Sequence, residues 1–134
     1  TSHAHGVDAD IQDEEDIYES CKWLKEMALN LGCVVVCSGK IDVITDGKEV
    51  NLISNGCDML SRITGTGCML NVAIATFLAS FPPLNACVKA TCYYEVAAEK
   101  TECNGPGTFH MHFMDEIYKL TSFDESLFKI EVLG

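Results

Sequence analysis

The chain has 134 residues, a length that suits one domain with a hydrophobic core. Hydrophobic residues make up 48% of it and charged residues 22%, which is the composition of a globular protein and excludes a disordered chain. A formal net charge of -11 repels phosphate backbones and anionic lipid headgroups, so neither nucleic acid nor a membrane is expected as a partner. A phosphorylated ligand would have to be held by backbone N–H groups, a helix dipole or a metal ion.

The cysteines fall inside helix and strand patterns, and no signal-peptide pattern precedes them. We therefore interpret them as reduced core residues of a cytoplasmic protein. Their spacing lacks the paired Cys-x-x-Cys motifs of a zinc site. No apolar stretch reaches the roughly 18 residues of a membrane-spanning helix. The eight cysteines are Cys21, Cys33, Cys37, Cys57, Cys68, Cys87, Cys92 and Cys103.

The first half of the chain has an α/β pattern. Residues 14–31 predict an amphipathic helix that ends at Gly32. The apolar run Cys33–Cys37 is typical of a strand buried on both faces, as in a parallel sheet covered by helices. The apolar residues of the helix recur at spacings of three and four, namely Ile17, Cys21, Leu24, Ala28 and Leu31.

A β-hairpin is predicted next, because the segments 41–45 and 49–54 flank Asp46-Gly47, a pair that favours left-handed backbone angles. We expect this hairpin to add antiparallel strands at a sheet edge. The C-terminal segment 128–133 alternates apolar and polar residues, which indicates either an edge strand or an unpaired end.

The second half is predicted to be helical. A glycine-rich loop, Thr64–Cys68, opens a helix over residues 69–78, and two further helices are predicted over 83–102 and 106–120. The apolar stripe of the first of these helices consists of Leu70, Ala73, Ile74, Phe77 and Leu78.

The loop Gly65-Thr66-Gly67-Cys68 is the strongest candidate site. Two glycines let successive N–H groups point at one spot beside the positive end of a helix, and such a spot binds an anion. The loop is neither a P-loop, which ends in Gly-Lys-Ser/Thr, nor a dinucleotide fingerprint, which needs a small residue where this chain has Leu70. A capped turn without function is the alternative.

The segment Ile63–Leu70 closely resembles the hydroxyethylthiazole kinase family, and other landmarks follow in that family's order. They are Gly6–Asp8, Val36–Gly39, the hairpin start 42–47, Asn55-Gly56 and Gly105–Phe109. The resemblance covers nearly the whole chain and corresponds to the family's C-terminal half. The resemblance therefore implies that residues 1–134 are a partial domain whose N-terminal half is missing, and a chain that begins at Thr1 instead of Met is consistent with a fragment.

The resemblance implies the C-terminal half of a ribokinase-like layered fold, with a mixed sheet, a β-hairpin edge and flanking helices. It implies that Thr66, Gly67 and Cys68 form an anion hole for the transferred phosphoryl group. Gly65 falls where the family contacts the thiazole, and Ser38 falls at a position, usually Thr, that contacts ATP. Most ribokinase-like enzymes have an aspartate base where this chain has Cys68, and we hypothesise that Cys68 positions the substrate hydroxyl and accepts its proton late.

The implied reaction is ATP-dependent phosphorylation of 4-methyl-5-(2-hydroxyethyl)thiazole, with Mg²⁺, in a homotrimer whose sites lie between subunits. The acids around Mg²⁺ and a phosphate-contacting arginine would lie upstream of Thr1, so no metal-binding residue is predicted here. Two alternatives stay open. The chain could be a non-catalytic remnant or structural partner of intact subunits, or another ribokinase-like kinase such as a hydroxymethylpyrimidine kinase, which Cys68 argues against.

Two other patterns are assigned no function. The His-x-His pairs His3/His5 and His110/His112 could suggest a metal site, but the second pair lies in a predicted helix, where this spacing points the side chains apart. Glu95, Glu99 and Glu102 are interpreted as a solvated stripe on one helix face.

Overall fold

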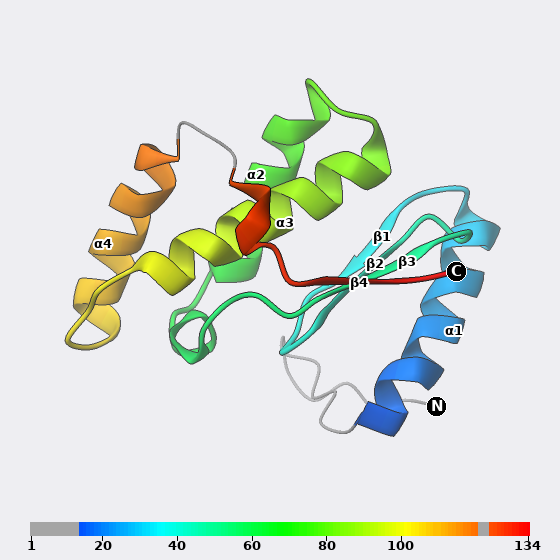
Figure 1. Cartoon of the computed structure of the whole chain (residues 1–134), viewed down its shortest axis with the longest axis horizontal. Helices are drawn as coiled ribbons and strands as arrows, with labels where there is room; N and C mark the ends of the chain where they lie inside the picture. Colours follow the sequence, from blue (N-terminus) through cyan, green and yellow to red (C-terminus); the bar gives the residue numbers. More distant parts are fainter. Residues whose placement is uncertain (1–13, 121–123) are drawn as a thin grey trace. The chain divides into compact units, whose positions relative to one another are not determined.

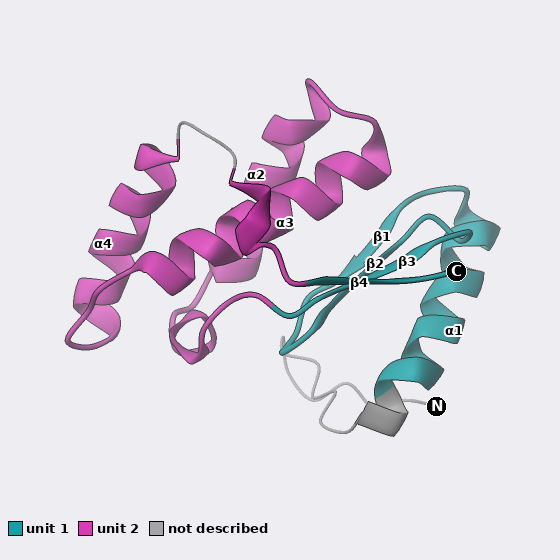
Figure 2. Ribbon diagram, viewed as in Figure 1, with its two compact units in different colours: residues 1–54, 130–134 teal, residues 55–129 magenta. Residues whose placement is uncertain are grey.

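The structure is a computed structural model that describes residues 14–120 and 124–134 (Figure 1). The chain divides into two compact units (Figure 2). Unit 1 consists of residues 1–54 and 130–134, and unit 2 of residues 55–129. The landmark Gly6–Asp8 and the pair His3/His5 lie outside the described residues. The single partial domain predicted for residues 1–134 stays a prediction.

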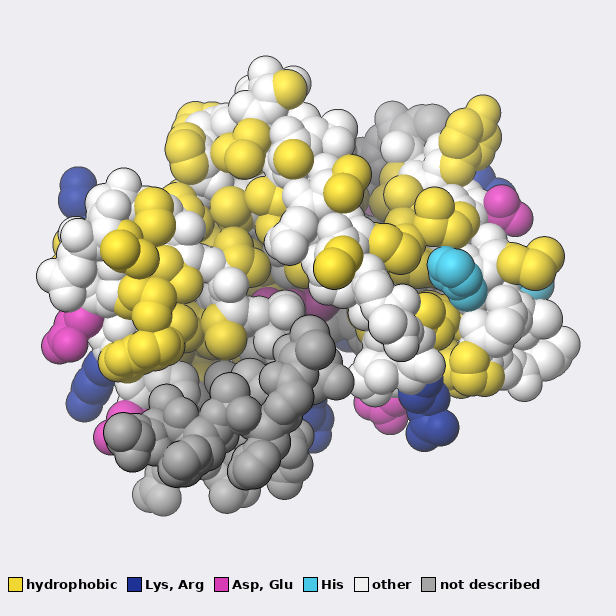
Figure 3. All heavy atoms as spheres, turned by 180° about the vertical axis from the view of Figure 1, so that it is seen from behind, with side chains coloured by type: hydrophobic (Ala, Val, Ile, Leu, Met, Phe, Trp, Pro, Cys, Tyr) yellow, Lys and Arg dark blue, Asp and Glu magenta, His cyan; other side chains and the backbone are white. Residues whose placement is uncertain are grey.

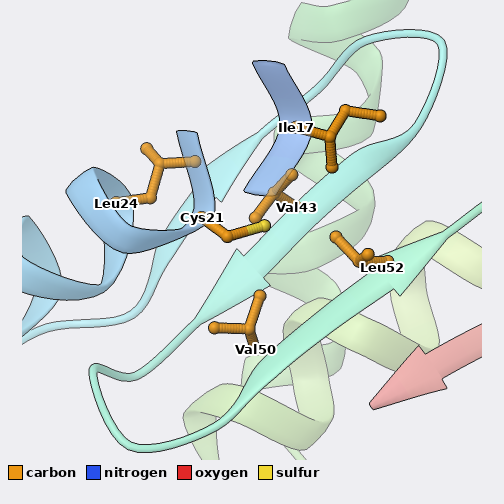
Figure 4. Close-up of a cluster of buried hydrophobic side chains, with 6 residues drawn as sticks. All are labelled: Ile17, Cys21, Leu24, Val43, Val50 and Leu52. Carbon is orange, nitrogen blue, oxygen red and sulfur yellow. The ribbon is translucent and has the colours of Figure 1, made fainter. Parts of the chain in front are cut away.

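Unit 1 is a helix on a four-stranded antiparallel sheet. Helix α1 (Glu14–Leu31) has the predicted bounds and is followed by β1 (Val35–Cys37), β2 (Asp42–Thr45), β3 (Val50–Ile53) and β4 (Ile130–Leu133). The strand order is β1-β2-β3-β4, with Val43 opposite Leu52 and Val50 opposite Leu133. Figure 4 shows the core between helix and sheet, formed by Ile17, Cys21, Leu24, Val43, Val50 and Leu52.

The α/β class and the hairpin are confirmed, but three details of unit 1 differ from expectation. Strand β1 is only half-buried and pairs antiparallel with β2, so the parallel surroundings predicted for it are not found among the described strands. The hairpin is central instead of at an edge, because β1 and the C-terminal β4 pair on either side of it. Leu31 is 67% exposed, since α1 ends there, before Gly32.

The hairpin turn is closed by local hydrogen bonds and by close packing on α1. The N–H groups of Lys48 and Glu49 donate to Asp46 Oδ1 at 2.8 and 2.9 Å. The hydrogen bond from the Glu49 N–H, and then that from the Lys48 N–H, lowers the pKa of the Asp46 carboxyl group. Gly47 has φ +89°, and a Cβ atom there would lie 2.5 Å from Cγ of Leu29 and 2.9 Å from its backbone nitrogen. The turn therefore requires glycine for its backbone angle and for the space beside α1.

Gly47→Ala is expected to destabilise unit 1 by roughly 2 to 4 kcal/mol, because backbone strain adds to a steric overlap that the Leu29 backbone cannot relieve. The free energy of unfolding is measured in urea from the fluorescence of Trp23, the single tryptophan, which lies in α1. Gly32→Ala is the matched control, since Gly32 has φ +65° but nothing within 4 Å of an added Cβ. It is expected to cost about 1 kcal/mol. Equal losses in the two variants would contradict the steric argument.

Unit 2 is built from three helices. Helices α2 (Thr66–Leu78), α3 (Pro83–Lys100) and α4 (Pro106–Lys119) agree closely with the predicted ranges, and the short 3-10 helices η1 (Asp58–Arg62) and η2 (Glu125–Leu127) complete it. Helix α3 packs against both α2 and α4. It is buried from Ala90 to Ala98, a stretch whose many small residues allow close helix packing. Of the predicted α2 stripe, Leu70 and Ile74 are buried, whereas Leu78 is 46% exposed.

Of the three acids predicted to form a solvated stripe, Glu99 and Glu102 are exposed, and Glu102 lies beyond the end of α3, whereas Glu95 is not exposed. Glu95 is buried, with 6% of its surface exposed, beside Gly56. Glu99 Oε1 accepts hydrogen bonds from the Gly56 N–H (3.0 Å) and the Asn55 side-chain amide (3.2 Å), and it pairs with Lys129 Nζ at 3.0 Å. Asn55 in turn accepts from the Lys129 N–H at 2.7 Å. Glu95 and Glu99 therefore lie on the face of α3 that contacts the first and last residues of unit 2.

All eight cysteines lie within the described residues and are free thiols. Their interpretation as core residues holds for Cys21, Cys87 and Cys92, whereas Cys33 and Cys68 are exposed because they lie at a helix end and a helix start. In the described part of the chain, none of the helices combines the length and apolar character of a membrane span.

Candidate anion-binding site at the start of helix α2

The backbone at the start of α2 presents free amide donors. Gly65 is the N-cap residue, and its φ of +95° is left-handed, a conformation that glycine adopts without strain. The Met69 N–H donates to the Gly65 carbonyl at 3.0 Å, which closes the first helical turn. The N–H groups of Thr66, Gly67 and Cys68 precede this bond, so they have no acceptor within the helix. Three donors thus meet the positive end of the helix dipole.

Hydrogen bonds from two directions hold this turn. The Thr66 hydroxyl donates to the Leu60 carbonyl at 3.0 Å and lies 3.4 Å from the Ile63 carbonyl. The Tyr94 hydroxyl, from α3, donates to the Thr66 carbonyl at 2.8 Å. Because the Thr66 hydroxyl is engaged with η1 and the segment after it, the group that Thr66 offers to a ligand is its N–H.

The side chains at the front of the turn leave room for a ligand. Gly67 is exposed, and no atom lies within 4 Å of a Cβ built on either Gly65 or Gly67. The Cys68 thiol is exposed as well. An exposed thiol beside three amide donors can meet a substrate hydroxyl, whereas a buried helix-start cysteine could not.

Ser38 lies in unit 1, whereas Gly65, Thr66, Gly67 and Cys68 lie together in unit 2. Ser38 is exposed and directly follows the carboxyl end of β1. The expectation that ligands bind at the carboxyl ends of strands applies to parallel sheets, whereas β1 pairs antiparallel with β2, so the role of Ser38 rests on the family resemblance. The Gly39 N–H donates to Asp42 Oδ1 at 2.9 Å, which fixes the loop after Ser38. Burial, and then the charge of Asp42, raises the pKa of the Cys37 thiol.

Two residues that hold the glycine turn and the loop after Ser38 in place were not predicted from the sequence. Tyr94 and Asp42 are buried polar residues, with 5% and 2% of their surfaces exposed. The only sequence signal for either is a polar side chain within an apolar stretch, Asp42 between Ile41 and Val43, and Tyr94 in the small-residue helix. That signal indicates a hydrogen-bonded group but not its partner.

Other features of the described residues do not form a second polar site. A cavity of about 180 Å³ in unit 2 is lined mainly by apolar side chains. Tyr94 lines this cavity and also contacts the glycine turn through its hydroxyl group. No group of three or more His, Cys, Asp or Glu side chains in the described part of the chain could hold a metal ion. His110 and His112 lie in α4, as predicted. On the face of the molecule drawn in Figure 3, hydrophobic side chains lie beside the histidine side chains. His112 Nδ1 lies 2.7 Å from the Glu102 carbonyl. The cavity is lined by Ala73, Phe77, Ala90, Tyr93, Tyr94, Ile117 and Leu120.

Comparison with known proteins gives one consistent family. The model of the hydroxyethylthiazole kinase family matches residues 1–123. A hydroxyethylthiazole kinase from Pyrococcus furiosus is 40% identical over 131 residues, which cover 96% of this chain and 48% of the relative. Hydroxyethylthiazole kinase 1 from Methanosphaera stadtmanae is 36% identical over 126 residues, or 87% of this chain and 44% of the relative.

A solved structure gives the same result. The hydroxyethylthiazole kinase protein from Pyrococcus horikoshii superimposes with a TM-score of 0.81 at 30% sequence identity, over 90% of this chain and 49% of that one. The chain therefore spans about half the length of the relatives that it matches.

Proposed function

Because the chain belongs to the hydroxyethylthiazole kinase family, we propose that it carries the phosphoryl-binding part of a kinase. The proposed reaction transfers the γ-phosphoryl group of ATP to the hydroxyl of 4-methyl-5-(2-hydroxyethyl)thiazole, in thiamine biosynthesis or salvage. The proposed location is the cytoplasm, and the proposed assembly is a homotrimer. The location rests on the interpretation of the cysteines as reduced residues, and the assembly rests on the family resemblance alone.

One observation carries the proposal, namely the three N–H groups of Thr66, Gly67 and Cys68 at the start of α2. Phosphoryl transfer passes through a loose transition state, in which the protein mainly positions the reactants and stabilises negative charge. Fixed backbone donors at a helix N-terminus supply that stabilisation without rearranging during the reaction. This is the arrangement expected of an anion hole.

The remaining predicted roles are proposed on the same basis. Gly65 would contact the thiazole, and Cys68 would hold the attacking hydroxyl and accept its proton late in the transfer. Ser38 would donate its hydroxyl to ATP. When Mg²⁺ is bound with ATP, it neutralises charge on the phosphates. No residue of this chain is proposed as a ligand of that Mg²⁺.

The test is ATP-dependent phosphorylation of the thiazole alcohol, detected by mass spectrometry. The chain is assayed alone and together with the N-terminal half of the Pyrococcus furiosus relative. We expect product with the supplied half and little without it, because each half contributes part of the site. If the two halves bind each other and fold but yield no product, the kinase proposal is contradicted, and the role of a non-catalytic partner is favoured instead.

A further inference from the structure

Tyr94 links the buried helix α3 to the glycine turn. Its hydroxyl donates to the Thr66 carbonyl at 2.8 Å, across 28 positions of sequence. The side chain is 5% exposed, so its place is fixed by packing. Its ring meets Phe113 edge to face at 4.9 Å, and Phe113 stacks on Phe109 at 5.3 Å. The phenol is therefore held from α4 while it donates toward α2.

The atom that Tyr94 contacts belongs to the same peptide unit as the Gly67 N–H. A peptide unit is planar and trans, so its C=O and N–H point in opposite directions. A bond that fixes the direction of the Thr66 carbonyl therefore also fixes the direction of the Gly67 N–H. That carbonyl points along α2, and the Gly67 N–H points out of the start of the helix.

The same bond strengthens the donor. A hydrogen bond to a carbonyl polarises its peptide unit, and the N–H of that unit becomes a better donor in turn. Burial, and then the charge of Glu95, raises the pKa of Tyr94. The phenol therefore keeps the proton that it donates.

We propose that Tyr94 is a positioning residue of the phosphoryl site, which holds and polarises the Thr66–Gly67 peptide so that the Gly67 N–H faces the transferred group. This inference rests on the proposed function. It assigns to a residue of α3 an indirect role in transition-state stabilisation. Tyr94 does not itself touch the substrate.

The experiment compares Tyr94→Phe with Tyr93→Phe in the full chain. Tyr93 is the matched control because it is the neighbouring tyrosine of the same helix, 4% exposed, with its ring on Phe77 and Phe128. The first readout is the ¹⁵N resonance of Gly67 without ligand. In Tyr94→Phe it should move upfield more than that of any other α2 amide, since the ring stays in place and only the polarising bond is lost. Tyr93→Phe should leave it unchanged.

The second readout is kinetic, with the N-terminal half supplied. Tyr94→Phe is expected to lower kcat roughly tenfold, the effect of one hydrogen bond, and to leave KM for the thiazole alcohol unchanged. A merely structural role would lower the folded fraction, which also lowers the apparent kcat at constant KM, so kcat is expressed per folded enzyme, as measured by circular dichroism. On that scale a merely structural role would leave kcat unchanged. An unchanged Gly67 resonance, or an equal fall of kcat in both variants, would overturn the inference while leaving the proposed function intact.

If the parent catalyses no transfer, the proposed function fails but the role of Tyr94 is still decided. Inorganic phosphate is then titrated into each variant, and the Gly67 amide is followed. We expect Tyr94→Phe to need a higher phosphate concentration than Tyr93→Phe for half of the shift. Equal titration curves, or no shift of Gly67 in any variant, would overturn the inference.

Discussion

The Gly67→Ala variant is expected to lose at least about 100-fold in kcat/KM, the effect of losing one oxyanion-hole donor, while its stability stays equal to or above that of the parent. No atom of the chain lies within 4 Å of the added methyl group, so the folded protein has room for it. Alanine is also the better helix former, by up to about 1 kcal/mol. The Cβ of a helical residue leans toward the N-terminus, which here is the space where the phosphoryl group would lie.

Gly107→Ala is the matched control for this change. Gly107 is the second residue of α4, as Gly67 is of α2, each helix has a glycine N-cap, and an added Cβ again meets nothing within 4 Å. The measurements are steady-state kinetics with the N-terminal half supplied and thermal unfolding of both variants. Full activity in Gly67→Ala would contradict the assignment of an anion hole at this turn, and a large loss of stability would show that the methyl group has no room.

Replacing Cys68 by aspartate is expected to keep or raise turnover, again measured with the N-terminal half supplied. An aspartate could hold the substrate hydroxyl and accept its proton, as in most ribokinase-like enzymes. The change costs no burial, because Cys68 is exposed. A carboxylate in the first turn of a helix also gains about 0.3 to 1 kcal/mol from the helix dipole. Cys68→Ala, which removes the group altogether, is expected to lower kcat.

Cys33→Asp provides the comparison for the charge change, because Cys33 is the other exposed cysteine and is not among the proposed site residues. It should leave kcat unchanged. A complete loss of activity in Cys68→Asp, with an intact fold by circular dichroism, would refute the assignment of Cys68 to the base position. Full activity in Cys68→Ala would show that the thiol has no part in the transfer.

The sequence by itself determined the α-helices, the β-hairpin and the family. The periodic apolar residues of α1 and the Asp46-Gly47 turn are local signals, because helix periodicity and turn angles depend on residues close in sequence. The glycine-rich start of α2 could also be predicted from the sequence, because Gly65 and Gly67 shape the turn through their own backbone geometry. Ser38 and Cys68 came from the resemblance, and their roles await the experiments above.

Only the tertiary structure decided what depends on partners distant in sequence. The apolar run Cys33–Cys37 predicts a strand buried on both faces in a parallel sheet, and this prediction is wrong, because β1 is half-buried and pairs antiparallel with β2. The tail 128–133 was ambiguous until β4 paired with β3. Glu95, at the surface by its residue type, is buried beside Gly56. Tyr94 reaches the Thr66 carbonyl across 28 positions, a contact that follows from the packing of α3 against α2 and that no local pattern encodes.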